Sequence, residues 1–251
     1  MTTRPERPEL PSAPGERTGG FLVRTWNLFH GNADPPRRRG HLREMLRLAS
    51  ADAPDVLCLQ ELPVWALPAI DDWSGGMHRF GVVTRPPLWP GPIAGWVTRL
   101  HQGLFRSGLA GQANAILLAP QLVGHDLGHG RISDHGRERR VVQAVRVDGL
   151  GVVANLHASN ELTRPAIPTA ELERARAFAE ERALPGETVV IAGDVNLRKA
   201  VLDGYSPPGA GIDHVLVRGA PAGPLVVWER ERRTMGGVVL SDHAPVELVV
   251  G

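Results

Sequence analysis

Apolar runs rich in Val, Leu and Ile recur along the chain, and polar or turn-forming residues bound each of them. Short runs of this composition are typical of buried β-strands. Where two such runs follow one another without a helix between them, their strands pair antiparallel, so we expect mixed sheets. The predicted strands are FLVRTW from residue 21, DVLCLQ from 55, NAILLA from 114, VVQAVRV from 141, GVVANLH from 151, TVVIAGD from 188, IDHVLV from 212, GPLVVWE from 223 and PVELVV from 245.

Two segments between these strands have the period of an amphipathic helix. In each, apolar residues three and four positions apart form one stripe, which a helix buries against its neighbours. The stripes are Leu42, Met45, Leu46 and Ala49 in residues 36–50, and Leu172, Ala175, Phe178 and Ala179 in residues 168–184.

Two other stretches show no long periodic pattern. Residues 62–112 are rich in proline and are expected to form loops and short elements. The tryptophans of this stretch either stack on a substrate or pack against the sheet ends. In the Gly-rich stretch that starts at residue 124, three histidines either bind a metal or lie in a solvated loop. The residues concerned are Trp65, Trp73, Trp89 and Trp96 in the first stretch, and His125, His129 and His135 in the second.

Length and composition indicate a single large α/β domain. A chain of 251 residues that is 42% hydrophobic can bury a substantial core. Residues 1–20 are rich in Pro, Gly and charge, so we expect a disordered leader followed by one catalytic domain over residues 21–251. The leader lacks the apolar core of a signal peptide, and no segment has the ~20 apolar residues of a membrane span. A cytoplasmic protein is therefore expected. Separately, we expect a monomer.

The charge balance excludes a strong global field. The chain has 28 basic and 27 acidic side chains, so an anionic substrate must be held by local contacts. The single cysteine, Cys58, lies inside an apolar run and is expected to be a buried thiol.

Polar residues follow several of the apolar runs directly. Taken singly, each has a structural explanation, such as a turn, a helix N-terminus, a buried histidine or a strand cap. For Asp194 and Asn196 two interpretations stay open: a turn, or a strand that continues and places both side chains on one face. The polar residues are Asn27, Glu61, His157, Asp194, Asn196, Asp213, Asp242 and His243.

In this order and at these intervals, six motifs resemble the endonuclease/exonuclease/phosphatase superfamily, which has the DNase I-like fold. The motifs are TWNLFHG from residue 25, LQELP from 59, NLHAS from 155, GDVN from 193, IDHVLV from 212 and LSDHAPV from 240. The resemblance implies a four-layer α-β-β-α sandwich of two mixed β-sheets flanked by helices, with a metal-dependent site that cleaves phosphoester bonds.

The resemblance also implies a role for each matching residue. Glu61 corresponds to the principal Mg²⁺ ligand, with Asn27 and Asp242 beside the metal. Asp194 and Asn196 correspond to the pair that orients the attacking water and contacts the phosphate. His243 resembles the phosphate-facing histidine, Asp213 the carboxylate that orients it, and His157 the histidine that assists the leaving group.

The residue types support a divalent cation independently of the resemblance. Four carboxylates in one cleft, those of Glu61, Asp194, Asp213 and Asp242, repel one another and raise each other's pKa values. A cation removes this conflict, and ligands that are all oxygen atoms suit Mg²⁺ or Mn²⁺ better than Zn²⁺.

Some positions depart from the family pattern or match it only weakly. The lysine that follows the motif glutamate in AP endonucleases is missing, since the text here is QELPVW. No acidic residue matches the partner that often orients the second histidine. Asn114 resembles a residue near the phosphate, and one of the three arginines 137, 139 and 140, with Arg140 preferred, resembles a phosphate contact.

Together these features predict a Mg²⁺- or Mn²⁺-dependent hydrolase of phosphoesters, most simply a phosphodiesterase or nuclease. The substrate is a nucleic acid, a nucleotide, or a phospholipid or inositol-phosphate head group. The alternative is a catalytically silent member of the fold that binds phosphorylated ligands.

Overall fold

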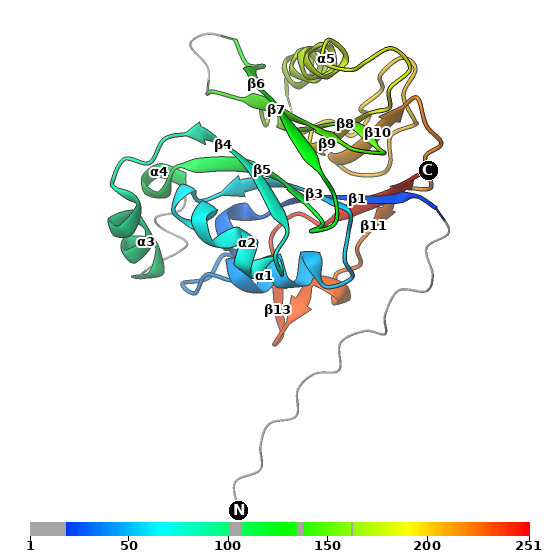
Figure 1. The fold of residues 1–251 in the computed structure, drawn as a ribbon. Coiled ribbons are helices and arrows are strands. Elements are labelled where there is room, and N and C mark those ends of the chain that lie inside the picture. Colours follow the sequence, from blue (N-terminus) through cyan, green and yellow to red (C-terminus); the bar gives the residue numbers. More distant parts are fainter. Residues whose placement is uncertain (1–18, 101–106, 135–137, 162) are drawn as a thin grey trace, which may run out of the picture.

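Two β-sheets pack against each other, and helices cover their outer faces (Figure 1). The computed structural model describes residues 19–100, 107–134, 138–161 and 163–251. The predicted leader, residues 1–20, lies almost entirely outside these ranges, and its disorder stays a prediction.

The first sheet has six strands in the order β11-β14-β1-β3-β5-β4. It is mixed as expected, because β1 runs parallel to β3 and antiparallel to β14. Its strands are β1 (Phe21–Asn27), β3 (Val56–Leu62), β4 (His78–Arg85), β5 (Gln112–Leu118), β11 (Val226–Val227) and β14 (Val246–Val250).

The second sheet has five strands in the order β10-β9-β8-β7-β6. It is also mixed, since β8 and β9 are parallel and the other neighbours are antiparallel. Its strands are β6 (Gly124–Arg131), β7 (Val141–Val147), β8 (Gly151–His157), β9 (Val189–Asp194) and β10 (Asp213–Arg218).

Short elements connect and cover these sheets. A small third sheet joins β2 (Ala33–Asp34), β12 (Thr234–Met235) and β13 (Val238–Leu240). The α-helices are α1 (Leu42–Ser50), α2 (Ile70–Trp73), α3 (Gly91–Leu100), α4 (Ser107–Ala110) and α5 (Ala166–Glu180), and the 3-10 helices are η1 (Phe29–Gly31), η2 (Val64–Ala69) and η3 (Glu231–Arg233).

Three apolar clusters confirm the predicted order of layers. One cluster lies between the sheets and includes Val23, Ile116 and Val190. A second cluster packs α5 on the outer face of the second sheet. The third packs α1, η2 and α2 on the outer face of the first sheet. The chain therefore forms the α-β-β-α sandwich, and Cys58 is buried inside it as expected.

The predicted helical stripes face the core. Leu42, Met45, Leu46 and Ala49 of α1 are all buried. In α5, Leu172, Ala175 and Ala179 are buried, and Phe178 packs against the same cluster while partly exposed. Both helices are shorter than the predicted segments.

Residues 62–112 form loops and short elements as expected, and these elements include β4 and α3. The loop predicted from residue 124 was wrong at its start, because the strand β6 occupies residues 124–131. Both β4 and β6 are edge strands, so their faces are only partly buried and they carry no continuous apolar run. The strand predicted from residue 223 is short: β11 covers only Val226–Val227, both exposed, while Gly223 and Trp228 add backbone hydrogen bonds to the same neighbouring segment. His125 and His129 lie on β6, and His135 lies outside the described residues.

Buried amides connect the two sheets. Asn155 on β8 donates through Nδ2 to the carbonyl oxygens of Leu59 and Ala115, at 3.0 and 2.9 Å. Its Oδ1 accepts from Gln60 Nε2 at 2.7 Å. Buried polar groups are tolerated when they are hydrogen-bonded, and these bonds fix how the strands of one sheet lie on the other.

Candidate active site

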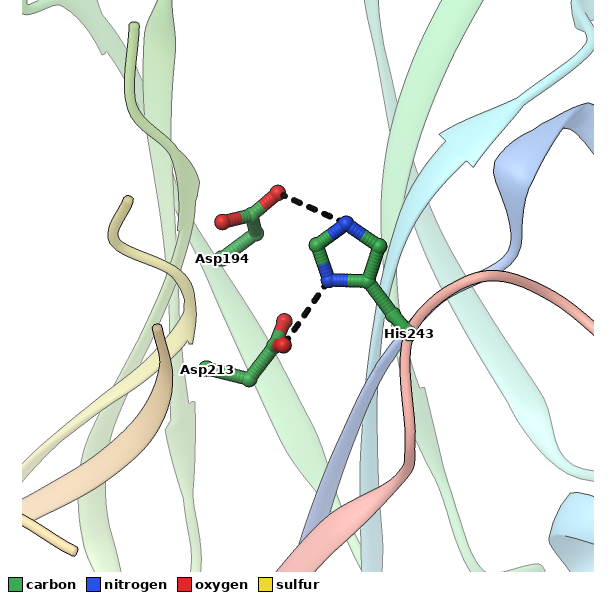
Figure 2. Close-up of side chains that lie close together, drawn as sticks. All are labelled: Asp194, Asp213 and His243. Atoms are coloured by element: carbon green, nitrogen blue, oxygen red, sulfur yellow. Dashed lines mark hydrogen bonds and ion pairs between the residues drawn. The ribbon is translucent and has the colours of Figure 1, made fainter. Parts of the chain in front are cut away.

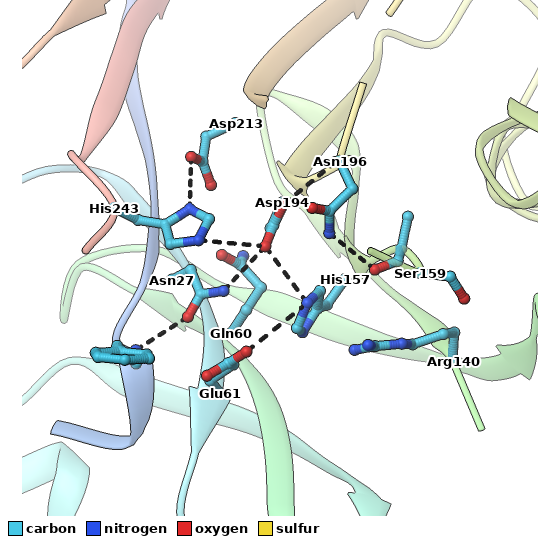
Figure 3. Close-up of polar contacts among 12 residues, drawn as sticks. Asn27, Gln60, Glu61, Arg140, His157, Ser159, Asp194, Asn196, Asp213 and His243 are labelled. Atoms are coloured by element: carbon cyan, nitrogen blue, oxygen red, sulfur yellow. Dashed lines mark hydrogen bonds and ion pairs between the residues drawn. The ribbon is translucent and has the colours of Figure 1, made fainter. Parts of the chain in front are cut away.

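Polar side chains converge at one edge of the sandwich, where β1, β3, β8 and β9 end and β10 begins (Figure 3). The pairing of the second sheet explains this convergence. Asp194 is the register partner of His157 on β8 and of Asp213 on β10. These three predicted residues therefore form one row across adjacent strands.

Asp194 is the centre of the group. Its Oδ2 accepts a hydrogen bond from Asn27 Nδ2 at 2.9 Å, and this bond joins the end of the first sheet to the second. The Nε2 atoms of His157 and His243 lie 3.3 and 3.8 Å from the same oxygen. Burial and the nearby charge of Asp213 raise the pKa of Asp194 to about 7, although His243 and Asn27 favour its charged form.

Asp213 and His243 form the predicted couple. His243 Nδ1 lies 2.8 Å from Asp213 Oδ2, so the ring donates to the carboxylate and directs Nε2 toward Asp194 (Figure 2). Burial alone lowers the pKa of His243, but the hydrogen bond and charge of Asp213, with Asp194 and Asp242, raise it to about 10. The imidazole is therefore held as a cation at neutral pH.

The Asp213→Asn variant tests this couple. Without the carboxylate, the pKa of His243 is expected to fall from about 10 toward its ordinary value. Because the folded state raises this pKa, the associated stabilisation is complete below the ordinary value of 6.5 and is lost as the pH rises through about 10. NMR titration of the imidazole in EDTA measures the shift, and equal pKa values in the two proteins would contradict the assignment.

Glu61 is set by an irregularity in β3. The pairing of β3 with β5 shifts register between Leu59 and Leu62, and Glu61 lies in this bulge with a φ of 54°. Its carboxylate lies 3.3 Å from His30 Nε2 and 3.9 Å from His157 Nε2. Burial and the charge of Asp242 raise the pKa of Glu61.

Strained backbone concentrates at this edge. A non-glycine residue with a positive φ is uncommon and persists where the surrounding structure holds it. Five of the six such residues in the described chain surround the site: Phe29, His30, Glu61, Asn196 and Ser241.

His157 is oriented by an amide. Gln112 Nε2 lies 3.1 Å from His157 Nδ1, and an amide nitrogen can only donate, so Nδ1 accepts and the proton of the neutral ring is on Nε2. Burial and the charges of Arg140, His243 and His30 lower the pKa of His157 well below its ordinary value. Gln112 thus orients the second histidine, a role for which no acidic residue of the sequence matched.

Asp194 and Asn196 satisfy the turn interpretation. The strand β9 ends at Asp194, and Asp194 Oδ1 accepts from the Asn196 N–H at 3.2 Å. Asn196 has a φ of 55°, and its Nδ2 donates to the Ala158 carbonyl oxygen at 3.0 Å. The strand does not continue through residue 196, because the side chain of Asp194 bonds the backbone that follows it.

The weaker candidates occupy different places. Of the three arginines, Arg140 lines a pocket of about 280 Å³ together with Glu61 and Gln112, whereas Arg139 is exposed and residue 137 lies outside the described ranges. Asn114 is fully buried two residues below Gln112 on the same face of β5, so a phosphate contact by its side chain stays a prediction.

Four residues at or near the site were not predicted from the sequence, although each lies within a motif or beside a predicted site residue. His30 contacts Glu61, Gln112 orients His157, and Gln60 and Asn155 form the bridge beneath them. The signal for each residue is its position inside a motif, next to the acid, amide or histidine that the motif predicts. The residues are His30 in TWNLFHG, Gln60 in LQELP, Gln112 in GQANA and Asn155 in NLHAS.

The residues at this edge suit a hard divalent cation. Asp213 Oδ1 is buried and has no hydrogen-bond partner, and burial together with a neighbouring carboxylate raises the pKa values of Glu61 and Asp194. Among the described residues, Asp194, Asp213 and His243 bring ligand atoms within 4.8 Å of one another. Glu61, Asn27 and Asp242, the ligands expected from the sequence, would offer only oxygen atoms, and their role stays a prediction.

Solved structures share this architecture. TDP2 from Caenorhabditis elegans is 17% identical, with a TM-score of 0.62 over 92% of this chain and 74% of that chain. The endonuclease/exonuclease/phosphatase from Beutenbergia cavernae is 18% identical, with a TM-score of 0.66 over 92% and 71%. A mannosyl-6-phosphatase from Bacteroides thetaiotaomicron is 14% identical, with a TM-score of 0.61 over 92% and 99%.

These likenesses show the fold, and no curated protein sequence matches the chain. Among the described residues, none of the helices combines the length and apolarity of a membrane span. The model of the endonuclease/exonuclease/phosphatase family matches residues 25–243, a range that includes most of the residues gathered at the site. The chain therefore belongs to the endonuclease/exonuclease/phosphatase family.

Proposed function

We propose that the protein is a Mg²⁺- or Mn²⁺-dependent hydrolase of phosphoester bonds that acts as a phosphodiesterase or nuclease. The observation that carries this proposal is the convergence on Asp194 of one amide and two histidines, those of Asn27, His157 and His243. Membership of the family and the likeness to a mannosyl-6-phosphatase support phosphoester chemistry.

Each side chain has a task that its contacts support. Asp194 is fixed by Asn27 and by its own turn, so its carboxylate can orient a water molecule and accept its proton. His243, a cation held by Asp213, can stabilise negative charge on a phosphate oxygen. His157, neutral because burial lowers its pKa, presents its Nε2–H toward the same place and can donate a hydrogen bond that stabilises the leaving oxygen.

The metal would be held by Glu61, Asn27 and Asp242. When bound, it would supply charge neutralisation on the phosphate and a water molecule of lowered pKa. Hydrogen bonds of Ser241 connect the backbone next to Asn27 and Asp242. Its Oγ donates to the Asn27 carbonyl oxygen at 2.7 Å and accepts from the His243 N–H at 3.1 Å.

The Glu61→Ala variant tests the metal assignment. Removal of this carboxylate is expected to weaken Mn²⁺ binding at least about 10-fold, since even the loss of an outer-shell partner has effects of that size. Isothermal titration calorimetry measures the affinity, and the exposed Glu181→Ala serves as the control.

A comparison with His243→Ala separates the two candidate metal sets. If Glu61, Asn27 and Asp242 hold the ion, His243→Ala retains Mn²⁺ while Glu61→Ala loses it. The reverse result would place the ion on Asp194, Asp213 and His243 instead.

The activity itself is tested with plasmid DNA, single-stranded RNA, an aryl phosphodiester and phospholipids, each with Mg²⁺ or Mn²⁺. Hydrolysis that EDTA and Glu61→Ala both abolish is the expected result. Hydrolysis that resists EDTA would contradict metal dependence, and a metal-loaded protein without turnover would support a binding-only member of the family.

A further inference from the structure

Four large apolar side chains are exposed within nine consecutive residues. Leu88 is 72% exposed, Trp89 44%, Ile93 49% and Trp96 57%. We name these four residues the apolar rim. Among the described residues, the other exposed large hydrophobics are aliphatic side chains elsewhere on the surface, whereas both exposed tryptophans belong to the rim. Exposed apolar patches of this kind mark contact surfaces.

In residues 91–96 of α3, small residues are buried and larger apolar residues are exposed. Its small residues Ala94 and Gly95 are buried, and a Cβ on Gly95 would lie 3.5 Å from the ring of Trp65. Ile93 and Trp96 are three positions apart, so they share one face, and both are exposed. Figure 1 shows α3 at the edge of the molecule, outside the layers of the sandwich. Ile93 and Trp96 therefore point away from the protein interior.

The rim adjoins the candidate active site. Arg85, three residues before Leu88, lines the same pocket as Glu61 and Arg140. A Cβ on Gly111 would lie 2.6 Å from the Pro87 backbone nitrogen, so the chain just before the rim packs against the residue that precedes Gln112. A molecule seated on the rim thus lies beside the pocket that receives the phosphoester.

The surrounding sequence is cationic. Residues 73–125 contain four arginines and no Asp or Glu. Two of the four, Arg79 and Arg85, pair with Asp71 and Glu138 from outside the stretch. An apolar surface within a stretch free of acids complements an anionic surface with an apolar interior.

We propose that the apolar rim docks the protein on an anionic phospholipid bilayer and that a phospholipid head group is the phosphoester brought to the site. This inference rests on the proposed hydrolase function. Tryptophan side chains combine an apolar ring with an N–H and favour the boundary between lipid and water. A phospholipid joins in one molecule the two features that lie side by side here, an apolar surface and a phosphate pocket.

The experiment is co-sedimentation with vesicles of phosphatidylcholine alone or mixed with phosphatidylglycerol, in EDTA so that no turnover occurs. The wild type is expected to bind the anionic vesicles more strongly, with affinity that falls as salt is added. The Trp89→Ala/Trp96→Ala double variant should lose about 10-fold or more of this affinity, because two apolar rings no longer leave water.

The matched control replaces apolar residues that are equally exposed elsewhere. The Leu184→Ala/Val201→Ala double variant should bind vesicles as the wild type does. Equal losses in both double variants, or no binding to any vesicle, would overturn the proposal. If light scattering shows a dimer that the rim variant abolishes, the rim binds a second copy of the chain. If the rim variant abolishes binding of an oligonucleotide, the rim binds nucleic acid. Either result, without vesicle binding, would overturn the proposal.

The two proposals fail separately. Vesicle binding without hydrolysis of any phosphoester in Mg²⁺ would support the docking surface and contradict the proposed hydrolase function. Hydrolysis of an aryl phosphodiester without vesicle binding would support the hydrolase function and contradict the proposed docking surface.

Discussion

The Asp194→Asn variant is expected to hydrolyse a phosphodiester about 10² to 10⁴ times more slowly than the wild type, the range that a positioned acid–base group contributes. An amide cannot accept a proton from water. In the wild type the carboxylate accepts a hydrogen bond from Asn27 Nδ2 and lies 3.3 Å from His157 Nε2. The NH₂ group of an asparagine could not accept from either nitrogen. Steady-state kinetics with Mg²⁺ or Mn²⁺ measure the loss.

Two comparisons show that such a loss is chemical. Asp194 is buried and its pKa is raised, so removal of its charge should leave the melting temperature in EDTA unchanged or higher. The exposed Asp203→Asn should keep wild-type kinetics. An Asp194→Asn protein that is folded and retains its turnover number would remove Asp194 from the mechanism.

Replacement of Arg24 by alanine is expected to lower the free energy of unfolding by about 3–5 kcal/mol, the cost of removing one partner from a buried ion pair. Arg24 is fully buried on β1. Its guanidinium donates to both carboxylate oxygens of Asp52 at 2.7 Å, bonds Glu247 and lies 4.5 Å from the ring centre of Trp228. The variant leaves the buried Glu247 with less compensation for its charge.

A second arginine at the same cluster is the control. Arg232 contacts the same two carboxylates at 2.9 and 3.0 Å, but its side chain is 39% exposed. Exposed pairs contribute at most about 1 kcal/mol, so Arg232→Ala should have a much smaller effect in urea denaturation. Equal losses in the two variants would show that burial does not decide the energy of this network.

The buried strands could be predicted because their chemistry is local. A strand covered on both faces needs a continuous apolar run, and β5, β8 and β9 show one. Edge strands have no such requirement. In β6 no residue is fully buried, and in β4 only Val82 and Thr84 are, so both escaped prediction.

The site was predictable as a set of residues but not as an arrangement. Asn27, Glu61, His157, Asp194 and Asp213 follow or begin apolar runs, and the structure brings these strand ends together. Gln112 could not be chosen from the sequence, because a glutamine at the start of a strand does not indicate its partner and the contact with His157 spans 45 positions. The bulge that directs Glu61 likewise depends on the pairing of β3 with β5.

By itself the sequence determined the buried strands and the faces of the two long helices, because both follow from the burial of apolar runs. The four layers and the family came from the resemblance of its six motifs. Only the tertiary structure decided which side chains meet, how Asp194 turns onto Asn196, which arginine reaches the pocket, and that an apolar rim adjoins it. The physical reason is that these contacts join residues far apart in the chain, and their geometry depends on the register of strands and the packing of sheets.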